Sequence, residues 1–156
     1  MAAASDVDSP WPMNASTKNP ERHEPRASAD EPRAFGTRAK RVLIADDNRD
    51  WADGLAVLLE EEGYTVHTAY DGREAIEAAY SFQPDIVVLD IRMPRLTGYE
   101  AARVFNRHPS STRPILVAIT AWAGESGKLR AEMSGFDHYL AKPAEPSEVL
   151  QLLKRL

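Results

Sequence analysis

The chain has 156 residues, enough for one domain of ordinary size and too few for two. Hydrophobic residues make up 43% and charged residues 28%, a balance typical of a globular protein rather than a disordered or fibrous one. The net charge of −5 argues against a nucleic-acid partner, which needs clustered Lys and Arg, and the lack of Cys excludes disulfides and cysteine nucleophiles.

Residues 1–40 hold five of the eleven prolines and show no sustained helix or strand period. This composition predicts a disordered N-terminal tail, and docking through Trp11 or Phe35 is the alternative. The first residues carry Asp6 and Asp8 where a signal peptide needs positive charge, and no apolar run is long enough to span a membrane. We therefore expect a cytoplasmic protein without membrane contact.

From residue 41 onward, short apolar runs recur five times. They are VLIA (42–45), YTVHTA (64–69), DIVVLD (85–90), PILVAIT (114–120) and HYLAK (138–142). Runs such as IVVL and ILVAI are apolar on both faces, which is typical of strands that are covered on both sides in a parallel sheet. The runs therefore predict five strands.

Amphipathic segments follow these runs. They are WADGLAVLLEEEG (51–63), DGREAIEAAYSF (71–82), GYEAARVFNRH (98–108), GESGKLRAEMSG (124–135) and EPSEVLQLLKRL (145–156). Gly63 is a natural residue just beyond a helix end, and Asp71 a natural N-cap. The alternation predicts an α/β domain over residues 41–156, a doubly wound (βα)5 fold with a five-stranded parallel sheet and helices on both faces. Five units are too few for an eightfold barrel.

Ligands of such sheets bind at the carboxyl ends of the strands. Asp46 and Asp47 follow the first run, and Asp90, Thr120 and Lys142 close the third, fourth and fifth. Three carboxylates at one edge repel one another unless a cation lies among them, and Mg²⁺ prefers oxygen ligands. Taken singly, each Asp is as well explained as a helix cap or turn residue. Their coincidence at one edge favours a metal site.

The motifs VLIADDN (42–48), DIVVLDIRMPRLTG (85–98), AITAW (118–122) and HYLAKP (138–143) together resemble the response-regulator receiver family over residues 41–156. The resemblance implies a flavodoxin-like strand order 2-1-3-4-5. It also implies a signalling protein, not a steady-state enzyme, that catalyses its own phosphorylation and dephosphorylation. The implied donor is the phosphohistidine of a histidine kinase or histidine phosphotransfer protein, and the implied cofactor is Mg²⁺.

Carried over residue by residue, the resemblance makes Asp90 the phosphoacceptor. Asp47 would bind Mg²⁺ directly and Asp46 through water, with Asp90 and the backbone carbonyl of Arg92 as further ligands. Lys142 would pair with a phosphoryl oxygen. An aspartate carboxylate can attack phosphorus as a nucleophile, so these roles are chemically consistent.

The resemblance also implies a switch. Thr120 would hydrogen-bond the phosphorylated form, and the rotamer of Tyr139 would report the change. The signalling surface would lie around Lys128, Arg130, Tyr139 and Glu148. Arg92 and Trp122 would border the path of the hydrolytic water, so their size predicts a long-lived phosphate. The alternative is that Trp122 points into solvent or towards a partner and has no kinetic role.

Three further expectations accompany the resemblance. The Lys142–Pro143 bond is expected to be cis, and Gly98 is expected to use backbone angles closed to other residues. Trp51 and Phe136 are assigned to packing.

Two other classes compete with this interpretation. A phosphatase of the haloacid-dehalogenase type needs a second Asp two residues after the nucleophile, and this chain has Arg92 at that position. Such a phosphatase also needs a substrate cap, and none is visible in so short a sequence. A phosphorylation-independent interaction module would have lost the switch, whereas all five strand-end residues are present here. No output segment follows Leu156, so the downstream target stays unknown: the chain could be a stand-alone receiver, a phosphorelay intermediate or the last domain of a longer protein.

Overall fold

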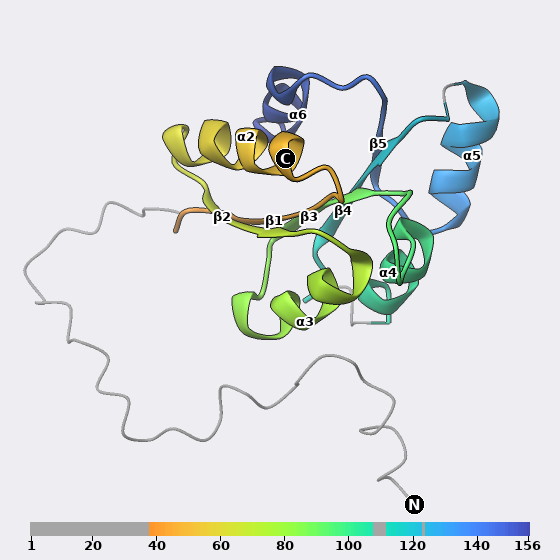
Figure 1. Ribbon diagram of the computed structural model, residues 1–156, viewed down its shortest axis with the longest axis horizontal. Helices are drawn as coiled ribbons and strands as arrows, with labels where there is room; N and C mark the ends of the chain where they lie inside the picture. Colours follow the sequence, from red (N-terminus) through yellow and green to blue (C-terminus); the bar gives the residue numbers. More distant parts are fainter. Residues whose placement is uncertain (1–37, 108–111, 123) are drawn as a thin grey trace, which may run out of the picture. The chain divides into compact units, whose positions relative to one another are not determined.

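The computed structural model describes residues 38–107, 112–122 and 124–156 (Figure 1). The expected N-terminal tail lies outside the described residues except for its last three positions. From residue 39 onward the described chain forms one compact unit. The fold and the candidate site therefore concern this unit alone.

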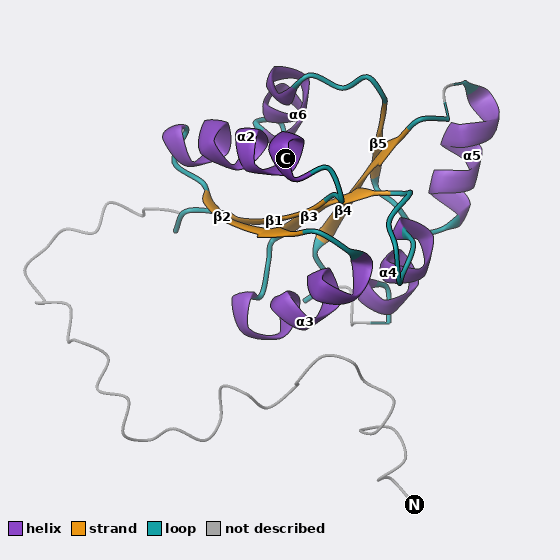
Figure 2. Ribbon diagram, viewed as in Figure 1, coloured by secondary structure: helices purple, strands orange, loops and turns teal. Residues whose placement is uncertain are grey.

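Five parallel strands form one sheet (Figure 2). They are β1 (Arg41–Ala45), β2 (Thr65–Ala69), β3 (Ile86–Asp90), β4 (Ile115–Thr120) and β5 (His138–Ala141). Their spatial order is β2-β1-β3-β4-β5, which confirms the expected order 2-1-3-4-5. Each predicted apolar run became a strand, with one end of each run shifted by one residue and the other end unchanged.

Five helices connect and follow the strands. They are α2 (Arg49–Glu61), α3 (Gly72–Phe82), α4 (Gly98–Phe105), α5 (Glu125–Met133) and α6 (Pro146–Leu153). In Figures 1 and 2, α2 and α6 cover one face of the sheet and α3 and α4 cover the other, while α5 lies beside β5. The doubly wound α/β fold is therefore confirmed.

The core lies on both faces of the central strands. Every residue of β3 is buried, because β1 and β4 flank it and helices cover both of its faces. On one face, Leu55 and Leu59 of α2 pack in the same apolar cluster as Val149 and Leu153 of α6. The edge strand β2 instead alternates exposed and half-buried positions before it ends in buried Ala69. This core fixes the strand ends at which the candidate site lies.

Side chains set the starts of two helices. Asn48 accepts the Trp51 backbone N–H at 3.2 Å, so α2 begins at Arg49, two residues before the amphipathic pattern indicated. Asp71 accepts the Glu74 N–H at 2.7 Å, which confirms it as an N-cap.

The ends of two helices differ in how well the sequence anticipated them. Gly63, with φ +94°, lies just beyond the cap of α2 as expected. Helix α4 ends at Phe105, earlier than the pattern indicated. The next side chain, Asn106, donates to the carbonyls of Ser134 and Gly135 at 3.4 and 3.2 Å.

The expectation for Gly98 is wrong in its reason. The left-handed angle in this loop belongs to Arg95, with φ +67°, and not to Gly98. Gly98 is instead required for space, because a Cβ there would lie 2.5 Å from the Asp90 carbonyl oxygen and 2.8 Å from the Ile91 Cα. The backbone of the β3–α4 loop thus packs directly on the end of β3.

We therefore expect Gly98→Ala to lower the free energy of unfolding by about 2–3 kcal/mol, the cost of overpacking against backbone that cannot move aside. Gly54→Ala is the matched control, because a Cβ at that helical position meets nothing within 4 Å. The control should gain about 0.5–1 kcal/mol. Urea denaturation measures both, and equal stability of Gly98→Ala and wild type would contradict the close approach.

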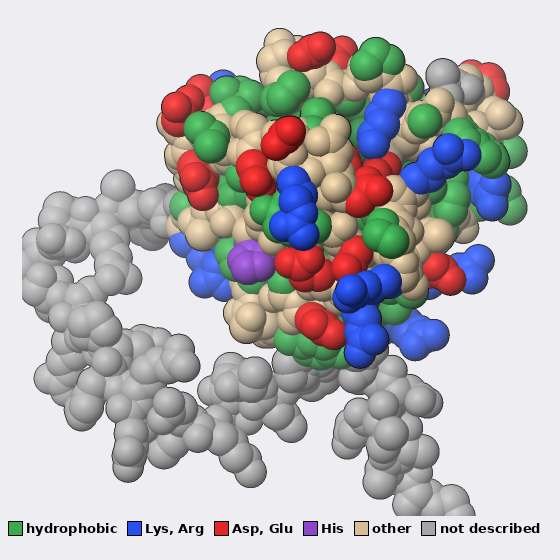
Figure 3. All heavy atoms as spheres, in the orientation of Figure 1, with side chains coloured by type: hydrophobic (Ala, Val, Ile, Leu, Met, Phe, Trp, Pro, Cys, Tyr) green, Lys and Arg blue, Asp and Glu red, His purple; other side chains and the backbone are tan. Residues whose placement is uncertain are grey.

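The surface carries mixed charge. On the face shown in Figure 3, Lys and Arg side chains are interspersed with Asp and Glu. No helix in the described part of the chain combines the length and apolar character needed to cross a lipid bilayer.

Candidate functional site

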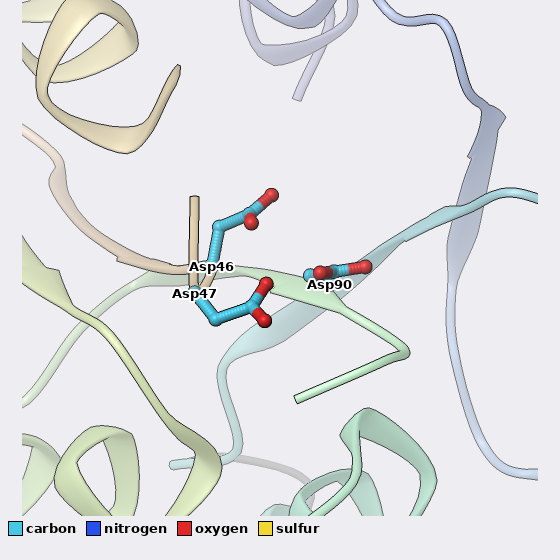
Figure 4. Close-up of side chains that lie close together, drawn as sticks. All are labelled: Asp46, Asp47 and Asp90. Atoms are coloured by element: carbon cyan, nitrogen blue, oxygen red, sulfur yellow. The ribbon is translucent and has the colours of Figure 1, made fainter. Parts of the chain in front are cut away.

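Three carboxylates meet where β1 and β3 end. Asp46 and Asp47 directly follow β1, and Asp90 is the last residue of β3. Because β1 and β3 are paired neighbours with Ala45 opposite Leu89, their carboxyl ends coincide. One oxygen of each carboxylate lies within 4.8 Å of the others (Figure 4). We call Asp46, Asp47 and Asp90 the carboxylate cluster.

The three carboxylates of the cluster differ in solvent exposure. Asp46 and Asp90 are 1% and 3% exposed, whereas Asp47 is exposed. Two buried charges are costly unless they are paired, because the protein interior solvates them poorly. The cluster therefore needs positive charge close by.

Lys142 supplies part of that charge. It follows β5, and its backbone N–H donates to the Thr120 carbonyl of β4 at 2.7 Å. Its Nζ lies 3.2 Å from Asp90 Oδ1 and 3.5 Å from Asp46 Oδ2. The following bond, Lys142–Pro143, is cis as expected. One lysine thus contacts both buried carboxylates of the cluster.

One lysine is not enough to bring the pKa values of the two buried carboxyls back to their ordinary range. Burial and, after it, the Asp46 carboxylate raise the pKa of Asp90 to about 6, although Lys142 opposes the shift. Burial also raises the pKa of Asp46, against the Asn48 N–H bonded to its Oδ1 at 2.8 Å and against Lys142. Without a bound cation, the negative charge of Asp46 and Asp90 therefore exceeds the positive charge that Lys142 supplies.

The donor set fits a hard divalent cation. Asp46 Oδ2 is buried and accepts no hydrogen bond within the described part of the chain, although Lys142 Nζ forms an ion pair with it at 3.5 Å. Mg²⁺ prefers oxygen ligands and is usually held by one or two carboxylates together with waters and phosphate oxygens, so this cluster offers enough of them. A cation among the carboxylates would stabilise their charged forms and lower their pKa.

Arg92 and Thr120 lie beside the cluster. The Arg92 backbone N–H donates to Asp90 Oδ1 at 3.3 Å, while its side chain is exposed. Thr120 ends β4 and is 3% exposed. The structure therefore places the Arg92 backbone against Asp90, and it places Thr120 directly after Ile119, the β4 residue paired with Asp90.

Trp122 links Thr120 to Tyr139. The Trp122 N–H donates to Thr120 Oγ1 at 3.1 Å, and the Tyr139 hydroxyl donates to the Trp122 carbonyl. The Trp122 side chain is 47% exposed. The backbone of Trp122 thus connects Thr120 of β4 with Tyr139 of β5.

Trp51 does more than the packing assigned to it. Its indole N–H donates to the Ala144 carbonyl at 3.0 Å, across 93 positions of sequence, while its ring packs against the core. This bond ties the start of α2 to the loop that follows Lys142. The sequence could have indicated a hydrogen bond of Trp51, although not its acceptor, because the N–H of a buried Trp usually has an acceptor.

Comparison with known proteins agrees with the geometry. The family model described as "Response regulator receiver domain" matches residues 42–154. Response regulator MprA of Mycolicibacterium vanbaalenii is 40% identical over 116 residues, which are 74% of this chain and 49% of MprA. The chain therefore spans about half the length of this relative.

Two solved structures share the fold. The chemotaxis response regulator CheY4 of Vibrio cholerae matches with a TM-score of 0.70 and 28% identity, over 75% of this chain and 98% of CheY4. The receiver domain of the sensor histidine kinase PA1611 of Pseudomonas aeruginosa, described with a magnesium ion in its active-site cleft, matches with a TM-score of 0.65 and 29% identity, over 75% and 96%. The chain belongs to the response regulator receiver domain family, the phosphoryl-accepting signalling domains of two-component systems.

Proposed function

We propose that Asp90 accepts a phosphoryl group from the phosphohistidine of a histidine kinase or a histidine phosphotransfer protein. The observation that carries the proposal is the buried Asp90 carboxylate, which has two further carboxylates within 4.8 Å and Lys142 Nζ at 3.2 Å. The receiver domain is taken to span residues 41–156, and residues 1–40 to be a tail outside it.

The chemistry needs little machinery. An oxygen of Asp90 attacks phosphorus, the phosphorus–nitrogen bond to the donor imidazole breaks, and the imidazole keeps the electron pair. No general base is required, because a carboxylate already carries the charge that attacks. The Lys142 ammonium, now beside Asp90, would pair with an oxygen of the transferred group. In dephosphorylation the oxygen of a water attacks phosphorus, the phosphorus–oxygen bond to Asp90 breaks, and inorganic phosphate leaves while the Asp90 carboxylate keeps the electron pair.

Mg²⁺ is the proposed cofactor. Asp46, Asp47, Asp90 and the backbone carbonyl of Arg92 would hold it. When bound, it supplies positive charge for the phosphoryl oxygens. The buried, donor-free Asp46 Oδ2 supports this assignment, as does the magnesium described in the PA1611 receiver.

Thr120 and Tyr139 form the proposed switch. A phosphoryl group on Asp90 would draw the Thr120 hydroxyl, which now accepts from the Trp122 N–H. Tyr139 bonds the carbonyl of the same residue, so a shift at Thr120 reaches β5 through Trp122. The face of α5, β5 and α6, around Lys128, Arg130, Tyr139 and Glu148, would then change its affinity for a downstream protein that is still to be identified.

Incubation with acetyl phosphate and Mg²⁺ tests the proposal. We expect intact-mass spectrometry to show one added phosphoryl group, and borohydride reduction followed by peptide mapping to place it on Asp90. EDTA should abolish the addition. A phosphoryl group on another residue, or full labelling in EDTA, would overturn the assignment.

The lifetime of the phosphate should depend on Trp122. Trp122 and Arg92 line the same cleft as Asp47 and Thr120, where their bulk would limit the approach of water to Asp90. We expect Trp122→Ala to lose its phosphate about threefold faster or more, and Trp122→Phe, which keeps a ring, to stay close to wild type. Equal or slower decay in Trp122→Ala, followed by loss of the added mass at fixed Mg²⁺, would rule out shielding by this side chain.

A further inference from the structure

A cleft of ≈ 600 Å³ lies between α4 and the loop that precedes α5. Met93 and Pro94 contribute apolar surface, Tyr99 and Trp122 contribute aromatic rings, and Arg92 and Arg130 contribute guanidinium groups. This volume falls within the range of small-molecule sites, which are mostly apolar with a few placed polar groups. Phosphoryl acceptance uses the carboxylate cluster and Lys142, and the roles proposed for Trp122 in phosphate lifetime and switching do not involve Tyr99, Met93 or Pro94 of this cleft.

Arg130 is held in place by the two rings. Its guanidinium carbon lies 4.9 Å from the centre of the Tyr99 ring and 5.1 Å from that of the Trp122 ring. Arg130 projects from α5, a helix whose buried residues are Gly127 and Ala131. Contact with two aromatic faces leaves the edge of a guanidinium free to donate, and this edge is what binds a carboxylate with two parallel hydrogen bonds.

The cleft has an excess of positive charge. Within the described part of the chain, neither Arg92 nor Arg130 forms an ion pair, although five other ion-paired cations are seen there. Asp47 is the acidic residue among the described residues that line the cleft, and it belongs to the carboxylate cluster. Two unpaired guanidinium groups beside aromatic and apolar walls complement a ligand that is both planar and anionic.

We infer that this cleft binds a small aromatic anion, a carboxylate carried on a planar ring system. The carboxylate would pair with the free edge of Arg130, and the ring system would lie against Trp122, Tyr99, Met93 and Pro94. The ligand is a small molecule rather than a peptide, because the cleft has the volume of one compact molecule. Binding of this kind is independent of the proposed function, since it requires neither phosphorylation nor Asp90.

Titration of the full chain with 2-naphthoate, followed by ¹H–¹⁵N NMR of the tryptophan indoles, tests the inference. We expect the Trp122 indole signal to shift saturably with a dissociation constant of roughly 1 mM, which is usual for a ligand of this size. The Trp51 indole is an internal reference, because it lines a different cleft and donates to Ala144. Its signal should stay in place.

Variants separate the charge from the apolar contact. Arg130→Gln should weaken the binding of 2-naphthoate about tenfold. The affinity of Arg130→Lys should fall between those of wild type and Arg130→Gln, because a lysine keeps the charge but loses the planar fork. Lys128→Gln is the matched control: it removes a cation from the same helix but does not line this cleft, so affinity should be unchanged. Neutral 2-naphthylmethanol should bind wild type about tenfold more weakly than the carboxylate does.

Three outcomes would overturn the inference. One is the absence of a saturable Trp122 shift up to roughly 10 mM 2-naphthoate. Another is equal affinity in Arg130→Gln and wild type, which would leave Arg130 without the role assigned to it. The third is a Trp51 shift as large as that of Trp122, which would indicate non-specific binding.

Discussion

Asp90→Asn is expected to lose all phosphorylation by acetyl phosphate and, in metal-free buffer near neutral pH, to be more stable than wild type. The loss of labelling follows from the proposed role of Asp90, because an amide cannot act as the nucleophile. The gain in stability follows from burial. The variant replaces a carboxylate that is 3% exposed and close to Asp46 with a neutral group of the same shape.

The direction of the pH dependence follows from the raised pKa. Asp90 titrates at 3.8 when unperturbed and at about 6 in the folded protein, so between these values the folded state binds more protons than the unfolded state. The contribution of this group to stability is therefore complete below about pH 4 and is lost as pH rises through about 6. Each pKa unit corresponds to about 1.4 kcal/mol, and a buried, coupled carboxylate gives less than the full amount, so we expect about 1–2 kcal/mol.

Urea denaturation in EDTA at about pH 4 and about pH 8 measures the difference between wild type and Asp90→Asn. The advantage of the variant should appear only at the higher pH. Asp50→Asn is the matched control, because it removes an exposed carboxylate from the first turn of α2 and should cost about 0.3–1 kcal/mol through the helix dipole. A variant less stable than wild type at the higher pH would contradict the electrostatic strain ascribed to the carboxylate cluster.

The strands, and the edge of the sheet at which the candidate site lies, could be predicted because the information is local. Runs such as IVVL, apolar on both faces, indicate strands covered on both sides, and β3 is indeed buried throughout. Once the strands are parallel, their carboxyl ends share one edge, so Asp46, Asp90 and Lys142 are expected at that edge. The strand order came from family resemblance, since five βα units alone allow several orders.

Contacts between distant segments could not be predicted. Nothing near Trp51 in the sequence indicates that Ala144, 93 positions away, is the acceptor of its indole N–H. Arg95 has a left-handed backbone angle usually taken by Gly or Asn, beside an ion pair of 3.5 Å with Asp71. Each of these features depends on a partner that only the folded chain brings close.

The same reason explains why the aromatic contacts of Arg130 were missed. Sequence resemblance placed Arg130 on an expected signalling surface, as one exposed charge among several. The structure adds that Tyr99 of α4 and Trp122 of the β4–α5 loop lie on the guanidinium. Helix α5 is polar on most sides and buries only Gly127 and Ala131, so its sequence lacks the apolar stripe that would indicate which elements pack against it.

Lys142→Met is expected to slow phosphorylation by acetyl phosphate by about 100-fold to 1000-fold, the usual cost of removing one charged donor from a transition state. In wild type, Nζ lies 3.2 Å from Asp90 Oδ1, next to where the transferred group would be held. Met keeps the length of the apolar stem, so the packing of the β5–α6 loop should survive. Loss of the cation should also raise the pKa of Asp90 and Asp46 further, because Lys142 lowers both.

Rates of mass gain at fixed Mg²⁺ and acetyl phosphate measure the effect. Lys142→Arg should recover part of the rate, because it restores the charge with a different shape. Lys128→Met, on exposed α5, should react like wild type and controls for the loss of any one lysine. A rate for Lys142→Met within about threefold of wild type would show that the Lys142 ammonium does not stabilise the transferred phosphoryl group, and its contacts with Asp46 and Asp90 would then serve only to balance two buried charges.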